Sequence, residues 1–149
     1  MQMQYQPAAA QLQYVGVGRR FVATLIDAIL YLIVFAVVAV VSGHSQASGG
    51  SASASLSGAP ALIIDILFFL YYIVLEAVLG ATLGKLLLGI RVVNVDGSRI
   101  GWGASIIRNI LRIIDGLPFF YLLGAILIWT SPQKQRLGDR AAKTVVVRR

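Results

Sequence analysis

Two long apolar runs, separated by a segment without charge, constrain this chain more than any other feature of its sequence. They cover residues 21–41 and 60–79, and each is close to the roughly 20 residues that a helix needs to cross a hydrocarbon layer about 30 Å thick. All 13 lysines and arginines lie outside residues 21–84. Because basic segments stay on the cytoplasmic side during insertion, the pattern predicts a membrane helical hairpin with loop 42–59 on the outer side.

The composition also indicates a membrane protein. Hydrophobic residues make up 58% of the chain and charged residues 13%, whereas soluble domains have about 45–50% and about 25%. A net charge of +7 would suggest nucleic acid as the partner of a soluble protein. Here the basic residues flank apolar runs, so we expect the lipid bilayer and its anionic headgroups as partners, and no nucleic acid.

The remaining segments predict one domain of mixed local structure. The Gln-rich residues 1–18 predict a disordered tail, and the Ser/Gly-rich loop 42–59 predicts a flexible linker. The β-branched runs at 90–95 and 144–147 predict two short strands, which we expect to pair on the cytoplasmic side. The predicted fold class is therefore an all-α integral membrane protein over residues 19–148, with a helical hairpin, amphipathic and re-entrant helices, and a small two-stranded cytoplasmic β element.

Residues 104–130 are long enough to cross the membrane once, but that crossing would carry the basic C-terminal segment outside. Arg108, Arg112 and Asp115 recur at helical spacing among isoleucines and leucines, which predicts an interfacial amphipathic helix. Pro118 then interrupts the run and leaves an apolar segment too short to span. We expect an in-plane helix followed by a re-entrant or steeply tilted segment, and a full third crossing is the alternative. The expected helices cover about 19–41, 60–79, 103–116 and 118–130.

Ionisable side chains within the apolar runs are the candidate functional residues, since each costs about 2.5–3.5 kcal/mol on insertion scales. Arg20 precedes Asp27 by seven residues, so the two share nearly the same helix face and can form a pair. Asp65 and Glu76 are eleven residues apart and share one face of the second helix. Three carboxylates are therefore predicted to line one seam.

This seam has two interpretations. In the functional interpretation, buried carboxylates bind and release a proton or a small cation. In the structural interpretation, Asp27 pairs with Arg20, or with Arg108 or Arg112, and fixes the packing and register of the helices.

Catalytic and metal-binding motifs have little support in the sequence. The chain contains no cysteine, and His44 is its single histidine, so neither a Ser-His-Asp triad at depth nor a His/Cys metal site has a basis. Residues 80–85 read GATLGK, but a phosphate-binding loop needs four residues between its glycines and a Ser or Thr after the lysine. We predict no enzyme, no cofactor and no metal, and we assign Gly80 and Gly84 to helix packing.

Four segments, taken together and in this order, resemble the RDD family of membrane proteins. The family is named for one arginine and two aspartates, which Arg20, Asp27 and Asp139 match, with Asp115 as the alternative for the last. The resemblance covers residues 14–148. The segments are GRRFVATLID at 18–27, GATLGK and LGIRVV within 80–93, RNILRIID at 108–115, and QRLGD followed by TVVV within 135–147.

The resemblance implies a small multi-pass protein of the bacterial or archaeal plasma membrane, for which transport of unidentified ligands is suggested. Its N-terminus and C-terminus are expected on the cytoplasmic side. We expect transport of a proton, a small cation or an unknown ligand through the buried carboxylates. Two or three helices are too few to enclose an aqueous transport pathway, so a homo-oligomer or a membrane partner protein is expected. The alternative is a non-transporting membrane scaffold or accessory subunit.

Overall fold

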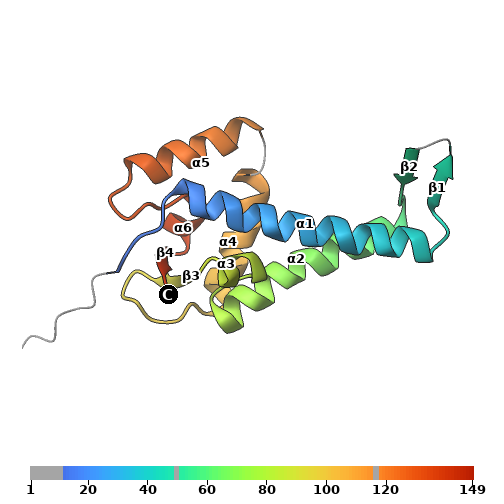
Figure 1. Ribbon diagram of the computed structural model, residues 1–149. Helices are drawn as coiled ribbons and strands as arrows, with labels where there is room; N and C mark the ends of the chain where they lie inside the picture. The colour runs from blue at the N-terminus through green and yellow to red at the C-terminus, as the bar shows by residue number, and fades with distance from the viewer. Residues whose placement is uncertain (1–11, 49–50, 116–117) are drawn as a thin grey trace, which may run out of the picture.

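The computed structural model describes residues 12–48, 51–115 and 118–149 of the chain. Two long helices, α1 (Val17–Val41) and α2 (Ala59–Leu79), lie side by side as an elongated hairpin (Figure 1). Only 11% and 17% of their most apolar windows are buried. A core helix of a soluble protein would be mostly buried, so this exposure favours lipid contact. The predicted hairpin of two candidate membrane helices is confirmed.

The loop at the far end of the hairpin carries two short antiparallel strands, β1 (Ser45–Ser48) and β2 (Ser51–Ala54) (Figure 1). Their register runs from Ser45 opposite Ala54 to Ser48 opposite Ser51. The sequence analysis predicted only a flexible linker here, and this is corrected. Serine, alanine and glycine carry little of the β-branched or aromatic signal by which strands are recognised in a sequence.

Short elements at the opposite end of the hairpin form a compact part that we call the head, comprising residues 12–16, 80–115 and 131–149. It contains α3 (Leu83–Leu87), β3 (Ile90–Asn94), α4 (Trp102–Asp115), α6 (Leu137–Ala141) and β4 (Thr144–Arg148). Strands β3 and β4 pair antiparallel, with Ile90 opposite Arg148 and Asn94 opposite Thr144. The predicted strand pair is therefore confirmed.

The segment before α1 extends this sheet. Val15 donates its N–H to the Val146 carbonyl at 2.9 Å, and Gln13 accepts from the Arg148 N–H at 3.0 Å. Val15 also joins Ile90 and Val92 in the small apolar core of the head. The predicted disorder of residues 1–18 is therefore wrong for residues 12–18. The ordered segment was missed because three pairing residues are too few to give a periodic signal in the sequence. Residues 1–11 lie outside the described part.

The long apolar stretch after residue 101 is divided between α4 and α5 (Pro118–Thr130). Helix α5 runs near the first part of α1 (Figure 1), and its 13 residues correspond to about 20 Å, which is short of a bilayer crossing. Helix α4 buries its polar residues Ser105, Arg108 and Asn109 against the protein. Its isoleucines form the exposed face, which is the arrangement suited to contact with lipid. They are Ile106, Ile107, Ile110, Ile113 and Ile114.

Candidate functional site

Six charged side chains meet where the head end of the hairpin joins the head. They come from α1, α2, α3, α4 and the α6 region, so five parts of the chain converge on one buried site. None of the six side chains is more than 20% exposed. We call this group the charge cluster. It consists of the carboxylates Glu76 and Asp139 and the basic residues Arg20, Lys85, Arg108 and Arg136.

Arg20 connects the first turn of α1 to α6. Its Nη1 donates to Asp139 Oδ2 at 2.5 Å, across 119 positions of sequence. Arg20 also donates to the main-chain carbonyls of Val15 and Lys134, at 3.1 and 2.6 Å. The predicted partnership of Arg20 with Asp27 is therefore wrong, because the side chain turns toward the head instead of along its own helix.

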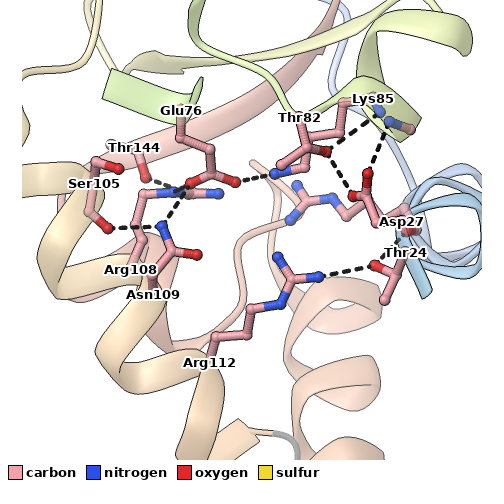
Figure 2. A network of polar contacts seen from close by, with 12 residues as sticks. Thr24, Asp27, Glu76, Thr82, Lys85, Ser105, Arg108, Asn109, Arg112 and Thr144 are labelled. Carbon is pink, nitrogen blue, oxygen red and sulfur yellow. Dashed lines mark hydrogen bonds and ion pairs between the residues drawn. The ribbon is translucent and has the colours of Figure 1, made fainter. Parts of the chain in front are cut away.

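Arg108 lies between the two carboxylates of the charge cluster and is 1% exposed. Its Nε donates to Glu76 Oε2 at 3.2 Å, and its Nη1 donates to Asp139 and to the Thr144 hydroxyl. Lys85 donates to the other oxygen of Glu76. Figure 2 shows Glu76 held from both sides by these basic groups. A single guanidinium thus links α2, α4 and α6.

The electrostatics of the head keep this arrangement ionised. Burial alone would raise the pKa of Asp139, but the attraction of Arg108 and two further arginines outweighs it and holds that pKa well below its usual range. Burial lowers the pKa of Lys85 to about 8, although Glu76 opposes the shift. At neutral pH the charge cluster therefore contains four positively charged groups and two ionised carboxylates, and each carboxylate is paired with more than one basic group.

Asp27 lies next to the charge cluster in a different environment. Its side chain is 1% exposed and accepts hydrogen bonds from Tyr71 Oη at 3.0 Å, Thr82 Oγ1 at 2.7 Å and the Gly84 N–H at 2.9 Å. Among the described residues, no basic side chain forms an ion pair with Asp27, so the predicted pairings with Arg108 or Arg112 are wrong as well. Asp27 is satisfied by neutral donors that anchor the start of α3 to α1.

The two glycines assigned to helix packing have different roles. A Cβ at Gly84 would overlap the carbonyl oxygen of Ala23, so this glycine allows α3 to approach α1 closely. Gly80 instead ends α2 in the left-handed conformation, at a φ of +70°, and a Cβ there would lie 2.9 Å from the Val92 carbonyl oxygen. Gly80 therefore sets the turn from helix to sheet.

Arg112 approaches the site without joining the charge cluster. Its guanidinium lies 3.9 Å from the centre of the Tyr72 ring, a cation–π geometry, and it donates to Thr24 Oγ1 at 3.3 Å (Figure 2). Arg112 therefore holds α4 against both α1 and α2.

The predicted seam of three carboxylates does not form. Asp65 is exposed and accepts a hydrogen bond from Tyr31 Oη at 2.7 Å, well along α2 from the head. Glu76 lies in the charge cluster and Asp27 in its own set of donors, so the three acids occupy three environments. The side chain of Asp115 lies outside the described part of the structure.

Several residues of the site were missed by the sequence reasoning. Lys85 and Thr82 belong to the GATLGK segment, and Arg136 belongs to the QRLGD segment, so the family resemblance already contained a signal for them. Asn109 likewise belongs to the RNILRIID segment. Tyr71 had no such signal, because an aromatic residue in an apolar helix is uninformative alone. Within the described residues, no group of three or more His, Cys, Asp or Glu side chains could hold a metal ion.

Comparison with known proteins identifies two curated relatives and a family. The chain is 39% identical over 87 residues to the "Uncharacterized protein YxaI" of Bacillus subtilis (strain 168), covering 58% of the chain and 56% of that protein. It is 33% identical over 84 residues to the "Uncharacterized membrane protein YteJ" of the same organism, covering 55% and 49%. The chain thus spans about half the length of these curated relatives, and no solved structure matches it. The RDD family model matches residues 14–143, a range that includes Arg20, Asp27 and Asp139, and the chain therefore belongs to the RDD family of membrane proteins.

Proposed function

We propose that this protein is a structural membrane module that holds its head against the cytoplasmic face of a prokaryotic plasma membrane. The saturation of both carboxylates in the charge cluster carries this proposal. Glu76 is paired with Lys85 and Arg108, and Asp139 is paired with three arginines. A carboxylate that transports a proton or cation must release its partners in each cycle. Release here would leave buried cations without a counter-charge, which is strongly unfavourable.

The charge distribution supports the proposed orientation. All 13 lysines and arginines lie in the head or in the first turn of α1, so we propose from the positive-inside rule that the head and both chain ends face the cytoplasm. The exposed apolar faces of α4 and α5 are proposed to contact lipid and a second copy or another membrane protein. In this proposal the protein catalyses no reaction and needs no cofactor.

Transport of a proton or small cation is the second candidate, and the environment of Asp27 favours it. This carboxylate is buried at the membrane hairpin, and its three hydrogen-bond donors are all neutral. Hydroxyl groups and a carboxylate are groups that exchange protons and coordinate small hard cations. Because the described residues contain two candidate spans, this function requires an oligomer to enclose a pathway.

Ion flux in vesicles distinguishes the two functions. Purified full-length protein would be reconstituted at a density that allows oligomers, and proton and sodium fluxes would be recorded with pH-sensitive and sodium-sensitive dyes. The variants are Asp27→Asn and, as a matched control, Asp96→Asn, which removes an exposed carboxylate from the turn after β3. Tyr71→Phe is a second test variant, because it removes one donor from Asp27 and leaves the carboxylate in place.

The structural proposal expects every variant to give the flux of protein-free vesicles. Flux in the wild type that Asp96→Asn retains and Asp27→Asn loses would overturn the structural proposal and establish transport. If Asp27→Asn does not fold, the same conclusion follows from an altered flux in Tyr71→Phe.

A further inference from the structure

A cavity of about 460 Å³ lies at the head end of α2, and its lining shares no residue with the charge cluster. One wall is apolar and includes Ala77, Val78 and Leu79. Arginines make up the polar part of the lining, at positions 91, 99 and 149. We infer that this cavity binds the headgroup phosphate of an anionic phospholipid, with the adjoining acyl chain against the end of α2.

The backbone of the head brings the three arginines to one place. Arg91 and Val93 are two residues apart on β3, so their side chains leave the strand on the same side. Arg99 forms an isolated bridge with Val93, and the Arg149 N–H donates to the Gly89 carbonyl at 2.8 Å. Three arginines from separate segments therefore line the same cavity.

These arginines differ from those of the charge cluster because they form no ion pair with an acidic side chain of the described residues. Among the described residues, Arg91, Arg99 and Arg149 take part in no ion pair, and the cavity lining includes no carboxylate side chain. All three side chains are exposed. A guanidinium binds a phosphate through paired N–H donors, so the site is complementary to a phosphate monoanion or diester.

The position of the cavity points to a lipid as the source of that phosphate. Val78 and Leu79 line it and are each 52% exposed, at the point where the apolar span of α2 ends. Because the hydrocarbon core gives way to headgroups at the end of such a span, the cavity lies at headgroup depth. An acyl chain can follow the apolar surface of α2 while its phosphate meets the arginines, whereas a soluble phosphate would leave the apolar wall without a ligand.

Lipid retention by the purified full-length protein tests this inference. The protein would be exchanged into mixed micelles containing phosphatidylglycerol or phosphatidylcholine, and bound lipid would be counted by native mass spectrometry. The test variant is the triple substitution Arg91→Gln, Arg99→Gln and Arg149→Gln. Its matched control is Arg19→Gln, Arg140→Gln and Arg148→Gln, which removes the same charge from exposed arginines outside the cavity.

Wild type and the control triple variant should prefer phosphatidylglycerol over phosphatidylcholine, and the cavity triple variant should lose that preference by at least about tenfold. Equal losses in both triple variants would overturn the inference, because binding would then follow net charge alone. Thermal melting of each variant would verify the fold, which substitutions at exposed positions should leave unchanged.

A variant that keeps every charge separates the cavity from general surface electrostatics. Ala77→Phe places a larger side chain in the apolar wall and should also abolish the preference for phosphatidylglycerol, whereas wild-type retention by Ala77→Phe would overturn the site. Inorganic phosphate alone is the remaining probe, and we expect it not to compete. Displacement of phosphatidylglycerol by inorganic phosphate at equal concentration would overturn the assignment to lipid and identify a soluble phosphate instead.

Discussion

The pair formed by Arg20 and Asp139 gives the most specific prediction about stability, because its two members have unequal numbers of partners. When Arg20→Met removes the arginine, Asp139 keeps Arg108 and Arg136. The free energy of unfolding should then fall by the contribution of one hydrogen bond between charged groups, about 1.5–3 kcal/mol. When Asp139→Asn removes the carboxylate, three guanidinium groups in buried surroundings lose their shared counter-charge. The expected loss is about 3–5 kcal/mol.

The double variant supplies the decisive comparison. Without Asp139, removing Arg20 also removes one of the repelling charges, so the double variant should be more stable than the sum of the single losses predicts. The expected coupling is about 1–3 kcal/mol, within the range for residues in one ion-pair network. Arg19→Met is the matched control, since this neighbouring arginine is exposed and should change stability by less than about 0.5 kcal/mol.

Reversible unfolding in mixed dodecyl maltoside and SDS micelles, followed by circular dichroism, measures these free energies. The reasoning predicts the order wild type, Arg20→Met, Asp139→Asn from most to least stable. Equal losses from the two single variants, or additivity within about 0.5 kcal/mol, would show that the ion pair seen in the structure does not couple α1 to α6.

Three further predictions concern packing, pH and topology. Gly84→Ala should lower stability by about 1–3 kcal/mol, because its Cβ would overlap the Ala23 carbonyl; the same unfolding titration measures this. The pKa of Asp139 is depressed in the folded state, so its carboxylate contributes its full stabilisation above the unfolded pKa of about 3.9 and loses that stabilisation as pH falls. Wild type should therefore lose more stability than Asp139→Asn below about pH 4. A cysteine at Ser55 should react with an impermeant maleimide in intact cells, and one at Ser98 only after permeabilisation; the reverse pattern would invert the orientation.

Much of the architecture could be predicted because its signals are local in the sequence. Each long apolar helix is specified by a single run, and the strands β3 and β4 by β-branched residues at 90–95 and 144–147. Their pairing then followed from the cost of unpaired backbone groups. The β1–β2 hairpin and the strand-like residues 13–15 escaped prediction, since neither has a side-chain pattern that distinguishes it from a linker.

The partners of the charged residues could not be predicted from local patterns. Helical periodicity placed Arg20 beside Asp27, but 119 positions separate Arg20 from its actual partner Asp139. The assignment of Asp27 failed for a related reason, because its donors Tyr71, Thr82 and Gly84 come from other elements. A sequence identifies which buried charges need partners, whereas tertiary packing decides which partners they obtain.

The environment of α4 explains why a protein of this kind keeps so many charges in its interior. In lipid, apolar helix faces gain little by packing together, because acyl chains are as apolar as the side chains they replace. Helix α4 exposes its isoleucines and buries Ser105, Arg108 and Asn109, so its attachment depends on polar contacts. Hydrophobic replacements for the charge cluster would remove the desolvation cost and, with it, the directional contacts that fix α1, α4 and α6 in one arrangement. Arg20 and Asp139, two of the residues matched to the family's name, lie at the centre of those contacts.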